Sequence, residues 1–326
     1  AAGAANPWFV RAASSDGATV VGDAAGQMPT FVTVVPGNDF ASYAGFGASG
    51  LLGTELDLSS PQGMLVGVGA TLQTLGAMVP SGVVTTLPDP TNTPSWNTVP
   101  WNSIPLDQAT ADQINAGLAG PYNGVLEVAA FFGIITAEEA ALRTINAVAG
   151  QNAVLIEDEN LTLIDLSALG GPVLPNIRQA NENDKIGLGT LQFLGEPVDP
   201  TNPALGVWGV TAPLPDFGTL TASEITDIQS QLATANAAIS ASVPNGWALF
   251  DLGGLYNEVV TTGVMEDDFM MTGDLVFGGF FSLDGYHPTS RGSALIAKRM
   301  MEAIDATWGS TLSEVGLDIG DYPTNY

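Results

Sequence analysis

The chain has 326 residues, of which 45% are hydrophobic and 8% aromatic, as expected of a globular protein rather than a disordered one. It carries 34 acidic residues and only seven basic ones, and a net charge of −27 argues against binding to nucleic acids or anionic membranes. The absence of cysteine excludes disulfides, thiolate metal sites and a cysteine nucleophile.

The acidic composition also bears on the surroundings of the protein. Such a surface stays soluble where salt screens its self-repulsion, over a Debye length of roughly 3 Å at 1 M salt. We therefore expect a saline or extracellular setting, with an acidic protein from ordinary surroundings as the alternative. The first residues, AAGAANPWFV, show neither an initiator methionine nor a signal peptide, which is typical of a processed or truncated end.

The first third of the chain predicts a strand–helix–strand unit. The run PTFVTVVPGND (29–39) indicates a buried strand over 30–35 that ends in a tight loop. Ser60 and Pro61 then open a long apolar helix that extends to about Met78, with Ser60 as its cap. A second strand follows over 82–87. This order is the βαβ unit of a parallel sheet.

The pattern becomes irregular between 89 and 220. The segment DPTNTPSWNTVPWNSIP (89–105) is rich in proline and tryptophan and indicates an ordered loop. Two predicted capping boxes follow, Thr110 with Gln113 and Thr136 with Glu139. The stretch NAVLIEDENLTLIDLS (152–167) indicates a strand with an acidic turn. We interpret residues 89–220 as an insertion or lid within a core formed by 1–88 and 221–326.

The regular pattern then resumes. Thr221 and Glu224 form a third predicted capping box at the start of a long helix. GWALFDL (246–252) predicts a third core strand, over 246–250, and a last helix runs from after Pro288 to about Thr307. The expected inward-facing residues of these two helices are Ile225, Ile228, Leu232, Ala235 and Ile239, and then Ile296, Met300 and Ile304.

Polar residues suited to acyl transfer follow the predicted strands. The only histidine, His287, comes three residues after Asp284 in the loop before the last helix, and Asn38 follows the 30–35 strand. Ligands of open parallel sheets bind at the carboxyl ends of the strands. There an imidazole can move protons at neutral pH, a carboxylate can orient it, and an amide can stabilise an oxyanion. The structural alternatives are a surface-loop histidine and an ordinary Asn-Asp turn.

Two of these segments carry a family resemblance. DGYHPTSRGSALIAKRM (284–300) resembles the fifth conserved block of SGNH hydrolases, the GDSL lipases and esterases, and VVPGNDF (34–40) is similar to their third block. The wider sequence resembles secreted or outer-membrane-associated members from Bacteroidetes-like bacteria. The resemblance implies a three-layer α/β/α sandwich around a parallel, flavodoxin-like sheet. It also implies a serine acyl-enzyme, with His287 as general base, Asp284 orienting it and Asn38 in the oxyanion hole.

The same resemblance implies no metal or organic cofactor, and a small-molecule, lipid or carbohydrate ester as substrate. Two departures from the family pattern matter. Pro36 replaces the first glycine of the third block, and the family's first two blocks, which hold the nucleophile, are missing. We therefore expect the serine upstream of residue 1. Two further strands are expected there too, one of them beside the 30–35 strand, whose apolar edge would otherwise be bare.

Two alternatives stay open at this point. The first is a non-catalytic SGNH-like protein that serves as a binding or structural surface component. The second is a calcium-stabilised surface protein that uses acidic stretches such as EDEN (157–160). The second is the weaker of the two, because those carboxylates lack the regular spacing of a calcium loop.

Overall fold

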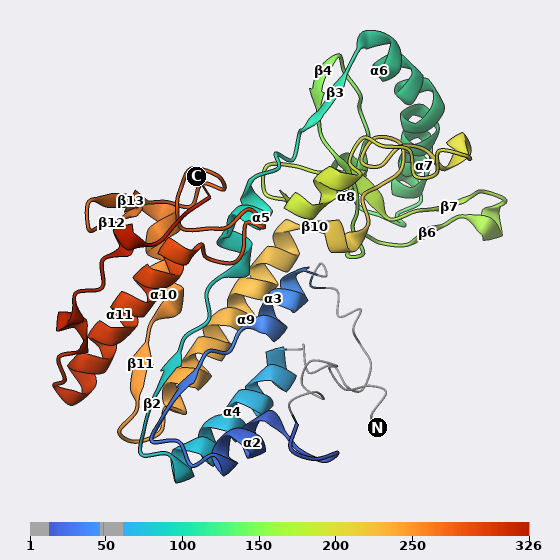
Figure 1. The fold of residues 1–326 in the computed structure, drawn as a ribbon. Coiled ribbons are helices and arrows are strands. Elements are labelled where there is room, and N and C mark those ends of the chain that lie inside the picture. The colour runs from blue at the N-terminus through green and yellow to red at the C-terminus, as the bar shows by residue number, and fades with distance from the viewer. Residues whose placement is uncertain (1–12, 46–47, 49–60, 326) are drawn as a thin grey trace. The chain divides into compact units, whose positions relative to one another are not determined.

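The structure is a computed structural model that describes residues 13–45, 48 and 61–325 of the chain, without the side chains of 38, 39 and 61–65. The chain divides into two compact units. Among the described residues, unit 1 comprises 13–43, 61–90 and 229–325, and unit 2 comprises 44, 45, 48 and 91–228. The chain is an α/β protein (Figure 1).

A parallel sheet of three short strands lies in unit 1. Its strands are β1 (Phe31–Val34), β2 (Ser81–Thr85) and β11 (Ala248–Phe250), in the order β1-β2-β11. Phe31 pairs with Ser81, and Ala248 pairs with Val83. These are the three core strands that the sequence predicts, and the sheet has the predicted parallel direction.

The central strand, β2, is covered on both of its faces. Val83 and Val84 are both fully buried, and neighbouring residues of a strand point to opposite faces. Such burial on both sides is typical of parallel sheets, whose crossover helices cover both faces. Figure 1 shows α10 and α11 on one side of these strands, with α4 and α9 on the other.

The helices of unit 1 include several that the sequence predicts. They are α2 (Val20–Gly26), α3 (Asn38–Gly45, up to residue 43), α4 (Pro61–Met78), α9 (Ala222–Ala241, from residue 229 on), α10 (Leu252–Thr261) and α11 (Ser290–Trp308). The expected helix after Ser60 is present as α4, although Ser60 itself lies outside the described residues. The last helix is present as α11, with Ile304 buried and Ile296 and Met300 packed against the core.

Unit 1 also contains a hairpin, which the sequence did not predict. Its strands are β12 (Val264–Glu266) and β13 (Phe269–Met271), joined by two aspartates with positive φ, Asp267 and Asp268. Lys298 of α11 binds Glu266 at 2.7 Å and Asp267 at 2.8 Å. Since the hairpin is tied to α11 in this way, it helps to fix the helix that follows the candidate site.

Unit 2 is built from short elements around apolar clusters. Its helices are α5 (Pro94–Asn97), α6 (Gln108–Ile114), α7 (Gly120–Phe131) and α8 (Ala137–Arg143), with a π-helical turn over Asn115–Ala119. Its strands are β3 (Ile104–Leu106), β4 (Gly150–Asn152), β5 (Leu155–Glu157), β6 (Ile164–Asp165), β7 (Val173–Leu174), β8 (Ile177–Gln179), β9 (Lys185–Ile186) and β10 (Thr219–Leu220). All of these strands form antiparallel pairs. Among its described residues, this unit therefore lacks the parallel strand pairs that regular βα repeats would give.

The three predicted capping boxes have different outcomes. At α9 both halves form, since Thr221 N donates to Glu224 Oε2 at 2.5 Å and Glu224 N donates to Thr221 Oγ1 at 3.4 Å. At α8 the Thr136 hydroxyl accepts from Glu139 N, but the Glu139 carboxylate binds Thr162 instead. At α6 the prediction is wrong, because Asp107 caps the helix and Thr110 lies within its first turn.

Candidate active site

The residues from 282 to 287 form a compact loop directly before α11. Ser282 N donates to His287 O at 2.7 Å, and Gly285 N donates to Ser282 O at 2.9 Å. Phe281 and Pro288 form an antiparallel bridge at the base of the loop. Gly285 has a φ of 73°, which a side chain would disfavour. The loop is therefore closed by its own backbone, and its two ends are fixed in the core.

The direction of α11 places this loop near the carboxyl ends of the strands. Trp308, at the end of α11, donates from Nε1 to Gly246 O at 2.8 Å, just before β11 begins. Its ring also packs edge-on against Phe31 at the start of β1, with centroids 5.9 Å apart. Because the 19 residues of α11 extend over about 28 Å, its first residues lie toward the other, carboxyl ends.

His287 and Asp284 form the hydrogen-bonded pair that the sequence predicts. The distance between His287 Nδ1 and Asp284 Oδ2 is 2.7 Å. The second carboxylate oxygen, Oδ1, accepts hydrogen bonds from Ser282 Oγ at 2.8 Å, Tyr286 N at 2.8 Å and His287 N at 2.9 Å. Partial burial acts to raise the pKa of Asp284, but these hydrogen bonds from Tyr286, His287 and Ser282 outweigh it and lower the pKa to about 2.

The ionised Asp284 sets the tautomer of the imidazole. A carboxylate can only accept hydrogen bonds, so Nδ1 of His287 must carry the proton that joins them. The other ring nitrogen, Nε2, is then left with its lone pair available. Among the residues that the structure describes, none makes a hydrogen bond to Nε2, and the side chain of His287 is 69% exposed. Nε2 could therefore accept a proton from a hydroxyl that reaches it.

Two neighbours of the pair were not singled out in the sequence. Ser282 supplies a hydroxyl to Asp284, and the Tyr286 ring packs edge-on against the His287 ring, with centroids 5.2 Å apart. Burial raises the pKa of Tyr286 to about 12, so its hydroxyl stays neutral. The Ser282–Asp284 hydrogen bond could have been predicted from the sequence, because a serine two residues before an aspartate often bonds to nearby carboxylates and backbone groups.

The third predicted residue, Asn38, occupies the first position of α3, directly after the loop that ends β1. Its side chain lies outside the described residues, so its role as an oxyanion-hole donor stays a prediction. The preceding residue, Gly37, has a φ of 149°, and a Cβ there would lie 3.7 Å from the side chain of Leu87, two residues after β2 ends. The backbone before Asn38 therefore runs beside the carboxyl end of the central strand.

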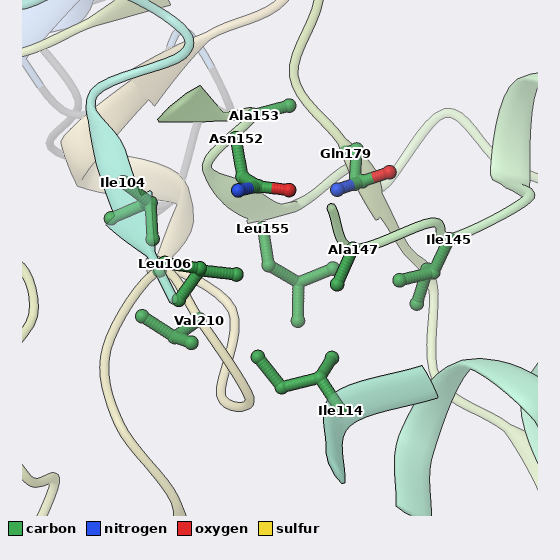
Figure 2. A pocket seen from close by; sticks show the side chains of 11 residues that line it. Ile104, Leu106, Ile114, Ile145, Ala147, Asn152, Ala153, Leu155, Gln179 and Val210 are labelled. Carbon is green, nitrogen blue, oxygen red and sulfur yellow. The ribbon is translucent and has the colours of Figure 1, made fainter. Parts of the chain in front are cut away.

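Two pockets of the described residues lie apart from this pair in their lining. An open groove in unit 1 lies along α10 and α11 and is lined by residues that include Asp251, Glu258 and Arg299. Figure 2 shows an apolar pocket in unit 2, into which Leu106, Ile114 and Leu155 point. Its cavity volume of about 10 Å³ is just enough for one water molecule and much too small for a substrate.

One group of residues in the described part of the chain could hold a metal ion. It consists of Glu159, Asp216 and Glu224 in unit 2. The sequence drew attention only to the EDEN stretch that contains Glu159, because the other two carboxylates lie far along the chain and no local spacing connects them.

Comparisons with protein-family models, with curated proteins and with solved structures find no match for this chain. Within the described ranges, no helix is both long and apolar enough to cross a membrane. The candidate site therefore has to be interpreted from its own geometry.

Proposed function

We propose that this protein hydrolyses carboxylic esters through a serine acyl-enzyme, with His287 as general base and Asp284 orienting it. The observation that carries the proposal is the 2.7 Å hydrogen bond between His287 Nδ1 and Asp284 Oδ2, which leaves Nε2 available. The ionised state of Asp284 would also stabilise the imidazolium that forms when Nε2 accepts a proton.

The steps follow from these groups. Nε2 takes the proton of a serine hydroxyl as its oxygen attacks the ester carbonyl, and an oxyanion develops. The Asn38 amide is proposed to donate a hydrogen bond to that oxyanion. The proton then passes from Nε2 to the leaving alcohol as the ester C–O bond breaks. Water repeats the sequence in the second half, which releases the acid and restores the serine.

The nucleophile is proposed to come from a segment upstream of residue 1 that pairs with the outer edge of β1. In support, β1 is an edge strand of the described sheet, with β2 as its partner. Phe31 is 41% exposed on this strand, and Val35, just beyond it, is 58% exposed. An upstream strand would cover this edge and complete an SGNH-type sandwich with a flavodoxin-like sheet.

The substrate and the location belong to the same proposal. An SGNH-type hydrolase with this acidic composition suits an extracellular or outer-membrane-associated role in a bacterium, and a small-molecule, lipid or carbohydrate ester as substrate. Residues 89–220 are proposed to shape the substrate site. No organic cofactor has a part in the proposed hydrolysis.

One observation favours a second candidate, a non-catalytic binding protein of the same fold. The side chains of His287 and Asp284 are 69% and 51% exposed, whereas catalytic pairs act best where water is largely excluded. An upstream segment packed beside the loop would reduce this exposure. In a binding protein the two side chains would remain exposed to solvent, and their hydrogen bond would serve only to stabilise the turn before α11.

The test is the initial rate of hydrolysis of p-nitrophenyl acetate and butyrate by the product of the complete reading frame. We expect His287→Ala to lower kcat by at least about 10²-fold, the usual contribution of a general base. Glu302→Gln, an exposed change on α11, is the matched control and should keep full activity. Hydrolysis that is equal in the native protein and in His287→Ala would favour the binding protein.

A further inference from the structure

Three carboxylates of unit 2, which have no part in the proposed hydrolysis, lie close together. Glu159, Asp216 and Glu224 each offer one oxygen, and these oxygens all lie within 4.8 Å of one another. Three negative charges at such distances repel strongly, more so where burial lowers the local dielectric constant. Either a shared proton or a bound cation has to offset this repulsion.

The fold brings these three residues together from distant parts of the sequence. Ile156 of β5 forms a parallel bridge with Leu214, so these two segments run side by side in the same direction. Glu159 and Asp216 come two or three residues after the bridge, one on each segment. Glu224 lies in the first turn of α9. Asn160 Nδ2 donates to Ser223 Oγ at 3.5 Å, which holds that turn against the loop that carries Glu159.

Glu224 supplies an observation that is independent of the clustering. The residue is only 5% exposed, and its Oε2 is occupied by Thr221, which donates from N at 2.5 Å and from Oγ1 at 2.8 Å. Its Oε1 is buried and makes no hydrogen bond within the described part of the chain. A buried carboxylate oxygen without a partner is costly, so it requires a ligand or a proton.

The nearest charge network does not neutralise this oxygen. Arg178 Nε binds Asp158 at 2.6 Å and its Nη1 binds Asp184 at 2.6 Å, so one arginine is already shared by two buried aspartates. Arg178 is therefore committed to Asp158 and Asp184, and a bound cation would supply the positive charge that this network does not give to Glu224.

We propose that Glu159, Asp216 and Glu224 bind one calcium ion, with Oε1 of Glu224 as its buried ligand. Calcium prefers oxygen ligands at 2.3–2.6 Å in a flexible geometry, so carboxylate oxygens that lie within 4.8 Å of one another can share one such ion. Magnesium demands a near-ideal octahedral geometry and usually keeps several waters, which suits three carboxylates from separate segments less well. The ion joins the β5 loop, the 3₁₀ turn Asp216–Gly218 and the start of α9.

The experiment is a calorimetric titration of the full 326-residue chain, freed of metal with EDTA, with calcium chloride at fixed ionic strength. We expect one class of specific sites, with one ion per chain, and a rise in melting temperature that sodium chloride at the same ionic strength does not reproduce. Glu224→Gln should weaken calcium binding by at least about 10-fold, the lower bound for the loss even of an outer partner of a metal ligand.

Two further variants make the result decisive. Glu182→Gln removes an exposed charge from the same unit and should bind calcium as the native chain does. Glu159→Gln removes the exposed ligand and should weaken binding even if Glu224→Gln does not fold. The proposal is overturned if calcium binds all four proteins alike, or if it does not bind the native chain. In the second case, a Glu224→Gln variant that melts at or above the native temperature would show that Glu224 shares a proton with Glu159 instead.

Discussion

At the His287 side chain, hydrogen bonding determines which ring nitrogen carries the proton. Asp284 accepts from Nδ1, while Ser282, Tyr286 and the His287 backbone occupy the other carboxylate oxygen. The backbone bonds depend only on the loop, whereas the imidazole bond depends on ionisation of the carboxyl. Asp284 therefore has two separable roles, as the centre of the turn and as the partner of the imidazole.

The imidazole role can be tested by NMR, because the chain contains a single histidine whose ring signals need no deconvolution. In the native protein we expect the neutral ring to be the Nδ1–H tautomer. In Asp284→Asn the amide can either donate or accept, so the preference should weaken toward the Nε2–H form that is usual in free histidine. The measurement is the pair of ring ¹⁵N shifts above the titration range. A native ring that is predominantly the Nε2–H tautomer would contradict the assigned hydrogen bond.

The ionisation of Asp284 should also be visible in the pH dependence of stability. Its folded pKa of about 2 lies below the unfolded value of about 3.9, so the ionised carboxylate stabilises the folded state above about pH 4. This contribution should be lost as the pH falls through that range toward 2. The free energies of unfolding of the native chain and of Asp284→Asn, measured with urea between about pH 2 and 4, should therefore converge at low pH. A difference between the two proteins that does not change with pH would rule out the lowered pKa of Asp284.

A buried charge in unit 2 gives a prediction of larger magnitude. Arg178 is 3% exposed and is the shared partner of Asp158 and Asp184, which are each 5% exposed. Arg178→Met would leave two buried carboxylates without their cation. We expect a loss of about 3–5 kcal/mol in the free energy of unfolding, measured with urea. Arg291→Met removes a half-buried arginine of unit 1 and should cost less than half as much. Equal losses would show that burial of the network contributes little.

At the scale of elements, α11 holds the candidate loop through its cap. The Thr289 hydroxyl accepts from Gly292 N at 3.0 Å and donates to Gly279 O at 2.6 Å. Thr289→Val keeps the shape but removes both bonds, so we expect a loss of about 1–2 kcal/mol in thermal or urea unfolding. Thr289→Ser, which keeps the hydroxyl, should retain most of the stability. If serine and valine cost the same, packing of the methyl group dominates instead.

Elements were predictable where their pattern was local and strong. The three core strands, α4, α9 and α11 follow from β-branched runs, apolar periodicity and caps within the segment itself. The helix α10 was missed because Gly253 and Gly254 look like a helix break in sequence. The structure shows why a glycine is needed: a Cβ on Gly253 would lie 2.5 Å from Leu87 O. A tertiary contact therefore decides a feature that local propensity opposes.

Other misses have the same origin. At α6 only Thr110 was considered as the cap, whereas the helix begins three residues earlier and is capped by Asp107. The turn of the β12–β13 hairpin consists of Asp267 and Asp268, which both have positive φ. The sequence did not predict this hairpin, because Asn-Gly and not Asp-Asp is the usual sequence of such a turn. In the candidate site, the pair from one short loop was predictable. The carboxylates of the proposed calcium site come from three segments and were not.

At the scale of the whole molecule, the net charge of −27 is the dominant feature. Self-repulsion of this size destabilises a compact state, and salt reduces it as the Debye length falls from about 10 Å at 0.1 M to about 3 Å at 1 M. We expect the melting temperature to rise as sodium chloride increases over this range. Sucrose at matched osmolality controls for general solute effects. A melting temperature that falls with salt would contradict this view of the surface.

The central claim is that His287 activates a serine, and covalent labelling tests it most directly. The product of the complete reading frame is treated with a fluorophosphonate, and its peptides are analysed by mass spectrometry. The account predicts that one serine upstream of residue 1 is modified in the native protein, and that His287→Ala abolishes the modification while Glu302→Gln does not. No modified serine, or labelling that is as strong in His287→Ala as in the native protein, would contradict it.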